Sequence, residues 1–263
     1  MILTKAKILV NERIRIKADF FLMELEAPEI AESACPGQFI MLSVTESESP
    51  YLKRPMGLNA IDKQAGCLRI IYQLKGKGTR AMTKLGPGER IEVLGPLGNG
   101  WSVKDGMKNV CLVGGGSGIA TLLPLAVELE RKGVQQMQII LGGKSAEHII
   151  CLEDFSDHGN HLRIATEDGT LGRAGMVDSY FEANPNYDMV YTCGPTPMMR
   201  AVARWASAHG LACEASLEER MGCGFGVCMG CVCETKPKDG HVCYQRVCRE
   251  GPVFAAEEVF FND

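Results

Sequence analysis

The pattern of hydrophobic and polar positions changes twice along the 263 residues of the chain. Residues 1–101 contain short runs with strand-like alternation, such as CLRIIYQL and RIEVLG, between the Gly/Pro turns PGQF, GPGE and GPLGNG. Alternating runs divided by such turns are typical of antiparallel sheets. We therefore expect residues 1–101 to form a small antiparallel β-barrel.

Residues 102–212 follow a different pattern, in which apolar runs alternate with helical stretches. The apolar runs are NVCLVG, MQIILGG, LRIATED and DMVYTCG, and the helical stretches are TLLPLAVELERKG, AEHIICLEDF, AGMVDSYFEAN and TPMMRAVARWASAHG. This alternation predicts an α/β domain with a doubly wound parallel sheet. Residues 213–263 are rich in glycine and cysteine and have little periodicity, so we expect a separate C-terminal module.

Composition narrows the class of protein. A hydrophobic fraction of 46% with 23% charged residues is typical of a soluble globular protein. The net charge of -4 and the lack of a Lys/Arg-rich block argue against nucleic acid as a partner. We see neither an export signal at the start nor an apolar stretch of membrane-spanning length, so we expect a cytoplasmic protein without a membrane partner.

The cysteines supply the most specific motif. Seven of the twelve lie between Cys213 and Cys248, and the run MGCGFGVCMGC places Cys223, Cys228 and Cys231 in a C-x4-C-x2-C arrangement. Cys248 follows in RVCREGP. Three thiolates from one loop and a distant fourth are the plant-type ligand spacing of a 2Fe-2S cluster. The sequence therefore predicts this cluster on these four cysteines.

Other interpretations of the cysteines stay open. A zinc site usually has closer pairs of cysteines, and a disulfide framework is typical of small secreted domains. Cys233 lies too near Cys231 for both to ligate one iron edge, so we interpret it as a packed thiol. Cys243 could replace Cys248 as the fourth ligand, although the Gly-Pro turn after Cys248 favours the latter.

Two strand ends in the α/β region are candidate dinucleotide sites. The first, in VCLVGGGSGI, comprises Gly114, Gly115, Gly116, Ser117 and Gly118. A glycine-rich turn before a helix can receive a pyrophosphate on its backbone N–H groups. Ile119 breaks the strict G-x-G-x-x-G pattern, so a simple tight turn remains an alternative.

The second strand end strengthens the nucleotide interpretation. It comprises Cys193, Gly194 and Pro195, which precede another helical stretch. In a parallel sheet, ligands bind outside the carboxyl ends of the strands, where both glycine-bearing turns are expected.

Two motifs in the barrel region indicate a second anion site. Arg54 stands in the sequence RPMG, and the run GKGT occupies residues 76–79. An arginine held by a following proline can bind a diphosphate with two hydrogen bonds, and the glycine turn can supply backbone donors to the same group. Together with the downstream sites, these motifs favour a flavin.

The ordered set of motifs along the chain resembles the ferredoxin-reductase superfamily. In order, these motifs are RPMG, IYQ, GKGT, GPLGNGW, VGGGSGI, TCGPTPMM, SLEERMGCGFGVCMGC and VCREGPVF. Within this superfamily, they are most similar to the electron transfer subunits of type B dihydroorotate dehydrogenases. The resemblance covers nearly the whole chain. It implies FAD in the barrel, NAD in the α/β domain and a 2Fe-2S cluster in the C-terminal module.

The resemblance also assigns residues. It implies that FAD contacts Arg54, Pro55, Met56, Gly57, Ile71, Tyr72, Gln73, Gly78 and Thr79. Gly57 departs from the usual Arg-Pro-x-Ser pattern, in which the serine hydroxyl can bond the flavin ring. The choice between NAD and NADP stays open, since it depends on side chains that form the ribose pocket.

The implied activity is an electron relay. An FMN-containing dihydroorotate dehydrogenase catalytic subunit would be the partner in a heterotetramer, with electrons passing through the 2Fe-2S cluster and FAD to NAD+ in pyrimidine biosynthesis. No catalytic acid or base is expected in this chain. The alternatives are a flavin subunit of an NAD(P)H:ferredoxin oxidoreductase or sulfide/sulfur reductase, and a zinc-stapled binding module.

Overall fold

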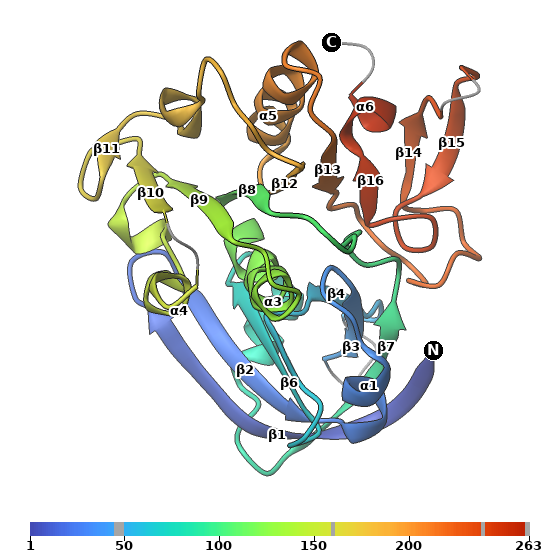
Figure 1. Ribbon diagram of the computed structural model, residues 1–263. Coiled ribbons are helices and arrows are strands. Elements are labelled where there is room, and N and C mark those ends of the chain that lie inside the picture. The colour runs from blue at the N-terminus through green and yellow to red at the C-terminus, as the bar shows by residue number, and fades with distance from the viewer. Residues whose placement is uncertain (45–49, 159–160, 238–239, 261–263) are drawn as a thin grey trace.

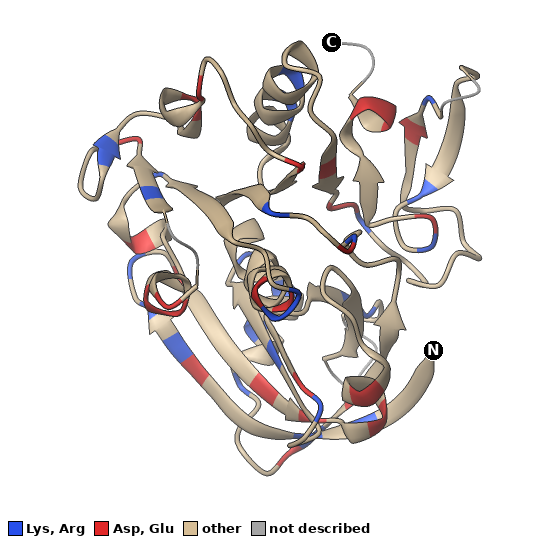
Figure 2. Ribbon diagram, in the orientation of Figure 1, with Lys and Arg blue, Asp and Glu red and all other residues tan. Residues whose placement is uncertain are grey.

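The computed structural model describes residues 1–44, 50–158, 161–237 and 240–260. Figure 1 shows a curved antiparallel sheet, an α/β unit and a C-terminal segment that packs beside both. The expected combination of an antiparallel sheet with a doubly wound parallel sheet is confirmed. Within the described ranges, no helix combines the length and the apolar character needed to cross a membrane. Figure 2 shows basic and acidic positions interspersed over the three parts.

The first sheet has the strand order β4-β3-β7-β1-β2-β6-β5, and every neighbouring pair is antiparallel. Its edge strand β4 also approaches β6, so the sheet curls into a partly closed barrel. The strands are β1 (Ile2–Arg15), β2 (Phe20–Glu26), β3 (Phe39–Ser43), β4 (Arg54–Gly57), β5 (Ala60–Asp62), β6 (Cys67–Gln73) and β7 (Arg90–Leu97). The two short helices beside them are α1 (Pro28–Ser33) and α2 (Lys77–Met82).

Alternation along the strands decides what fills the barrel. On β6, Leu68, Ile70 and Tyr72 belong to the barrel core, whereas Ile71 joins the core of the α/β unit. Successive side chains of a strand point to opposite faces, so one face of β6 fills the barrel and the other faces its neighbour. The two units therefore share a packed boundary, which is where the candidate flavin residues lie.

The second sheet has the order β11-β10-β9-β8-β12-β13-β16, and only β16 runs antiparallel to its neighbour. Counted along the chain, the five central strands follow the order 3-2-1-4-5 of a doubly wound fold. The strands are β8 (Asn109–Gly115), β9 (Gln136–Gly143), β10 (His161–Thr166), β11 (Arg173–Ala174), β12 (Met189–Cys193), β13 (Cys213–Ser216) and β16 (Val253–Ala255). The α-helices are α3 (Gly118–Arg131), α4 (Leu152–Ser156), α5 (Thr196–Ala208) and α6 (Ala256–Val259).

Helices cover both faces of this sheet. Val110 and Leu112 of β8 share a buried cluster with α3, whereas Cys111 and Val113 share one with α5. The strand is thus apolar on both faces, as expected for a central parallel strand. Helix α3 lies between the sheet and the barrel, so its start is held at the boundary of the two units.

Two of the expected helical stretches do not form continuous helices. The stretch AEHIICLEDF forms the 3-10 turn η1 (Ala146–His148) and then the short α4, because Cys151 between them adopts a left-handed backbone with φ of 56°. The stretch AGMVDSYFEAN forms only the 3-10 turn η2 (Val177–Tyr180). Gly175, with φ of 122°, precedes this turn, and Pro185 stands directly after the stretch. Such residues end helices.

The C-terminal segment adds the hairpin β14 (Val232–Thr235) and β15 (Cys243–Arg246). It is tied to the rest by β16, which pairs with β13, and by Asn99, whose backbone N–H donates to the carbonyl of Gly251 at 2.6 Å. Strands β13 and β16 lie beyond residue 212 and belong to the second sheet, in which β16 is the antiparallel edge strand. The domain boundaries after residues 101 and 212 stay predictions.

Candidate functional site

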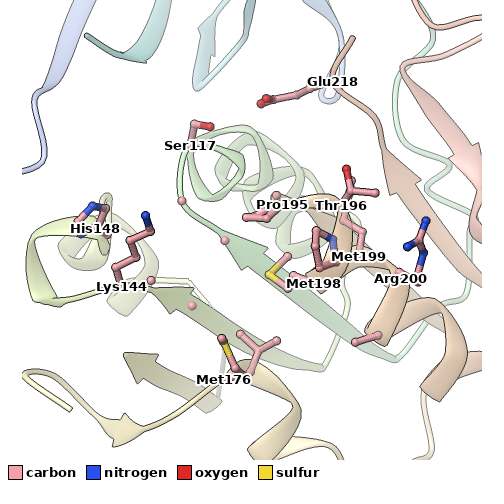
Figure 3. A pocket seen from close by; sticks show the side chains of 18 of the residues that line it. Ser117, Lys144, His148, Met176, Pro195, Thr196, Met198, Met199, Arg200 and Glu218 are labelled. Atoms are coloured by element: carbon pink, nitrogen blue, oxygen red, sulfur yellow. The ribbon is translucent and has the colours of Figure 1, made fainter. Parts of the chain in front are cut away.

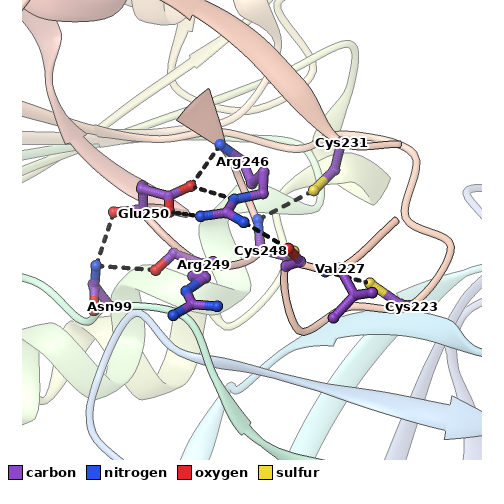
Figure 4. A network of polar contacts seen from close by, with 9 residues as sticks. Asn99, Cys223, Val227, Cys231, Arg246, Cys248, Arg249 and Glu250 are labelled. Carbon is purple, nitrogen blue, oxygen red and sulfur yellow. Dashed lines mark hydrogen bonds and ion pairs between the residues drawn. The ribbon is translucent and has the colours of Figure 1, made fainter. Parts of the chain in front are cut away.

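The four predicted ligand cysteines lie in two pairs. The backbone N–H of Cys223 donates to Cys228 Sγ, and that of Cys228 donates to Cys223 Sγ, each at 3.4 Å. The N–H of Cys248 donates to Cys231 Sγ at 3.4 Å, although 17 positions separate the two residues. The structure therefore brings together residues from one loop and one later segment, as Figure 4 shows.

Glycine and one arginine shape the loop around these sulfurs. Gly224 and Gly226 have φ of 80° and 91°, a region that glycine enters without strain. Arg246 Nη1 donates to the carbonyl of Gly226 at 2.6 Å, and its Nε donates to Glu250 Oε2 at 3.0 Å. This network joins the loop to the segment that carries Cys248 (Figure 4).

The donor set fits a diiron cluster. The sulfurs form two hydrogen-bonded pairs, and a 2Fe-2S cluster takes two protein ligands on each iron. Backbone N–H groups aimed at sulfur also stabilise a metal-bound thiolate.

The thiols of the two pairs have opposite pKa shifts. Burial raises the pKa of Cys223, but the backbone N–H groups of Cys228, Phe225 and Val227 outweigh it and lower the pKa to about 6. Burial raises the pKa of Cys248 to about 12, and the neighbouring Cys231 sulfur adds to the rise. A coordinated metal removes the proton from either kind of thiol.

Of the three other cysteines of the module, Cys213 lies on β13, and Cys233 and Cys243 lie on the hairpin. Cys243 is paired with Thr235, whose hydroxyl lies 3.4 Å from Cys243 Sγ. Burial raises the pKa of Cys233 to about 11. Neither residue joins the two hydrogen-bonded pairs among the described contacts. This arrangement supports Cys248 as the fourth ligand, and the assignment remains a proposal.

The loop that carries Cys223, Cys228 and Cys231, which we call the cluster loop, packs directly on the barrel. Cys231 and Cys248 belong to one group of buried side chains with Phe39 and Met41 of β3. A Cβ built on Gly224 would lie 2.5 Å from Met41 Cγ, so the loop backbone touches this strand closely. Phe39 also lines the neighbouring cavity, so this side chain belongs both to the cavity wall and to the buried group that contains the two cysteines.

This neighbouring cavity, which we call the flavin cavity, has a volume of 260 Å³ and lies between the barrel, α3 and β13. Of the residues expected to contact FAD, it is lined by Pro55, Met56, Gly57, Ile71, Tyr72, Gln73 and Thr79. Its walls combine apolar side chains with exposed strand backbone, which suits a flat aromatic ring with polar edges. Tyr72 contributes its main chain, because its ring stacks on Phe21 in the barrel and its hydroxyl donates to Asn11.

Arg54 and Gly78, which do not line the cavity, meet beside it. A Cβ built on Gly78 would lie only 1.9 Å from Arg54 Nε, so the guanidinium rests against the 76–79 turn. Thr79 Oγ1 orders that turn by accepting from the backbone N–H groups of Lys75 and Gly76 at 2.9 and 3.1 Å. The two motifs of the barrel region are therefore adjacent, as one diphosphate would require. The residues present fit FAD.

A second, larger cavity of 1160 Å³ opens at the carboxyl ends of the parallel strands. Of the residues expected to contact NAD, it is lined by Gly115, Gly116, Ser117, Gly194 and Pro195. The two turns nearly touch, since a Cβ built on Gly194 would lie 2.8 Å from the carbonyl oxygen of Gly115. We call this space the dinucleotide cavity. Its residues fit a pyrophosphate held by backbone groups.

Three residues of the same prediction lie elsewhere. A Cβ on Gly114 would lie 3.0 Å from Leu122, and one on Gly118 would lie 2.4 Å from the carbonyl oxygen of Cys193. These glycines let α3 pack closely on the sheet. Cys193 lines the flavin cavity and not the dinucleotide cavity.

Several lining residues were not expected from the sequence. Figure 3 shows Lys144, His148, Met176, Thr196, Arg200 and Glu218 around the dinucleotide cavity. Lys144 directly follows β9, so the rule of strand carboxyl ends could have found it. Glu218 follows β13, a strand that the sequence pattern did not reveal, and it lines both cavities.

Comparison with known proteins gives a consistent family. The family model "Iron-sulfur cluster binding domain of dihydroorotate dehydrogenase B" matches residues 218–260. A protein of Caldanaerobacter subterraneus subsp. tengcongensis, "Dihydroorotate dehydrogenase B (NAD(+)), electron transfer subunit", is 38% identical over 98% of both chains. A protein of the same name from Bacillus caldolyticus is 40% identical over 88% of both chains.

Two solved structures share the fold of this chain. The structure of an NADH-dependent reduced ferredoxin-NADP oxidoreductase superposes with a TM-score of 0.85 at 28% identity, covering 97% of this chain and 90% of that one. Phthalate dioxygenase reductase superposes with a TM-score of 0.66 at 19% identity, covering 94% and 77%, and shares the fold. The chain belongs to the family of electron transfer subunits of dihydroorotate dehydrogenase B.

Proposed function

We propose that this chain carries electrons between a dihydroorotate dehydrogenase catalytic subunit and NAD+. The observation that carries the proposal is the order of the three sites. Ser117 and Glu218 line both the flavin cavity and the dinucleotide cavity. Phe39 lines the flavin cavity and also belongs to the group of buried side chains that contains Cys231 and Cys248. A group in the flavin cavity would therefore stand between the other two.

The chemistry requires such an order. A nicotinamide exchanges two electrons as a hydride and an iron-sulfur cluster takes one electron, whereas FAD can do both. The chain supplies positions for these groups and an electrostatic environment, and we assign it no acid or base for dihydroorotate. The catalytic subunit with its FMN would oxidise that substrate, so the chain alone should not turn it over.

We propose that the following residues bind the cluster, FAD and NAD(H). Cys223, Cys228, Cys231 and Cys248 hold the cluster. Arg54 and the 76–79 turn hold the diphosphate of FAD, and the strand backbone of β4 and β6 lies along its ring. Gly115, Gly116, Ser117, Gly194 and Pro195 receive the pyrophosphate of NAD(H), the nucleotide named for the relatives.

The partner surface that we propose is the cluster loop itself. Phe225, Val227 and Met229 alternate with glycine and cysteine on this loop and are 39%, 71% and 51% exposed. Exposed apolar side chains close together often mark protein interfaces. A catalytic subunit docked here would lie next to the cysteines, in a heterotetramer with two copies of each chain. We propose the cytoplasm as the location, since thiolate ligands persist in a reducing compartment.

Loss of one cluster ligand tests the relay. We expect Cys228→Ser to abolish electron transfer to the catalytic subunit while NADH oxidation by artificial dyes continues at a rate near that of the native chain. The exposed Cys35 provides the control, because Cys35→Ser removes a thiol outside the cluster loop and should change neither rate. Normal electron transfer to the catalytic subunit by Cys228→Ser would refute the proposal.

A second candidate function deserves a direct comparison because of the structural similarity to the ferredoxin-NADP oxidoreductase. In that case the chain would pass electrons to or from a ferredoxin-like protein or a larger flavoprotein. Affinity purification from the native host discriminates between the two. Recovery of an FMN-containing subunit with dihydroorotate oxidase activity supports the relay, and recovery of a larger flavoprotein in its place supports the alternative.

A further inference from the structure

Thr121 of α3 and Gly57 of β4 meet in the wall of the flavin cavity, which both residues line. A Cβ built on Gly57 would lie 2.4 Å from Thr121 Cγ2. Carbon atoms in contact normally stay about 3.5–4.0 Å apart. The threonine methyl group thus occupies the space that a side chain at position 57 would need.

The hydroxyl group of Thr121 lies beside a second residue of the cavity wall, Cys193. Thr121 Oγ1 lies 3.0 Å from the carbonyl oxygen of Gly118 and 3.2 Å from Cys193 Sγ. Cys193 also lines the flavin cavity. A hydroxyl has one proton and two lone pairs, so it can donate to one of these neighbours and still accept a hydrogen bond from a ligand in the cavity.

Helix α3 holds this side chain rigidly. Thr121 stands in the first turns of a 14-residue helix whose neighbours Ala120 and Leu122 are buried. A β-branched side chain in a helix has few accessible rotamers, and the bond to Gly118 restricts it further. The methyl group and the hydroxyl are therefore both fixed before a ligand binds.

We propose that Thr121 positions the flavin ring in place of the side chain that Gly57 lacks, with its methyl group filling the gap beside Gly57 and its hydroxyl bonding the ring. The inference rests on the proposed function, because it needs FAD in this cavity. It explains how the chain departs from the Arg-Pro-x-Ser pattern and still offers a hydroxyl at this wall. The hydroxyl comes from a helix of the α/β unit and not from a barrel strand.

The first test separates the hydroxyl from the shape of the side chain. Thr121→Val keeps the branched shape of the side chain and removes the hydroxyl, so the absorption maxima of bound FAD should shift while the FAD dissociation constant rises no more than about tenfold, because one hydrogen bond is lost. Thr83→Val is the matched control, since the Thr83 hydroxyl bonds the carbonyl of Arg80 at 2.9 Å and lines neither cavity. A flavin spectrum of Thr121→Val identical to that of the native chain would overturn the proposal.

The second test concerns the pairing with Gly57. Gly57→Ser should clash with Thr121 and weaken FAD binding about tenfold or more, as overpacked sites do. Gly57→Ser combined with Thr121→Ala should recover most of that loss, because the clashing methyl group is gone. A double variant that binds FAD no better than Gly57→Ser would show that the two positions are not coupled. A native chain that binds no FAD contradicts the proposed function, whereas native FAD binding with an unresponsive Thr121→Val contradicts this inference alone.

Discussion

Replacing Gly78 with alanine is expected to displace Arg54 and to weaken FAD binding. The new Cβ would lie 1.9 Å from Arg54 Nε and 2.8 Å from its Cδ, so the guanidinium has to leave the 76–79 turn. The helix itself should not suffer. Gly78 lies within α2, where alanine is favoured over glycine by about 1 kcal/mol.

The size of the effect follows from the bonds that Arg54 would lose. A hydrogen bond to a charged group contributes about 1.5–3 kcal/mol. Since 1.4 kcal/mol corresponds to a factor of ten, the dissociation constant for FAD should rise about tenfold to 150-fold. Gly76→Ala is the matched control in the same turn. A Cβ built on Gly76 meets no atom within 4 Å apart from its chain neighbours, and the φ of this residue is -142°, so we expect FAD affinity within about threefold of the native value.

The assay is a titration of the flavin-free chain with FAD, followed by the change in flavin fluorescence. Thermal unfolding of each flavin-free variant shows whether the fold is intact. The reasoning is refuted if Gly78→Ala binds FAD as tightly as the native chain. It is also refuted if Gly76→Ala loses as much affinity as Gly78→Ala.

Three further predictions concern the cluster, the domain boundary and the effect of pH. Cys248→Ser should lose the iron and the visible cluster absorbance, whereas Cys243→Ser should keep both; loss in Cys243→Ser alone would reverse the ligand assignment. Asn59→Ala removes a buried amide that donates to the carbonyl of Ala120 at 2.8 Å, so urea denaturation should show a loss of about 1–3 kcal/mol, and an unchanged midpoint would contradict this. Backbone N–H donors lower the pKa of Asp188, so its stabilising effect is present above the unfolded pKa of about 3.9 and is lost as pH falls through the folded value. The difference in Tm between the native chain and Asp188→Asn should therefore be present at pH 7 and shrink below about pH 4.

Local patterns in the sequence predicted the features that depend on neighbouring residues. The C-x4-C-x2-C run, the glycine turn after β8 and the two long helices α3 and α5 each follow from short-range spacing. The helix expected over AEHIICLEDF does not form as one element, because its apolar residues are buried in the segment that connects η1 to α4. Ile149 and Ile150 are buried in the α/β core, although the chain between η1 and α4 is not helical there.

Features that depend on distant residues were harder to predict. Tyr72 lines the flavin cavity, but the alternation of β6 turns its ring into the barrel, so only its main chain is available to a ligand there. Glu218 lines both cavities because β13, which precedes it, pairs with β12 in the second sheet. Strand β13 has only four residues with little periodicity, so the sequence gives no sign of this pairing. The contact of Thr121 with Gly57 likewise requires two units to be packed together.

The most direct test of the relay is anaerobic titration of the isolated chain, containing its cofactors, with NADH. Electron paramagnetic resonance at low temperature would follow the cluster, and visible absorbance would follow the flavin. The account predicts that NADH bleaches the flavin and that the signal of a reduced 2Fe-2S cluster grows as reducing equivalents are added. A fully bleached flavin beside a cluster that gives no signal, yet gives one after dithionite, would contradict the claim that the flavin cavity connects the other two sites.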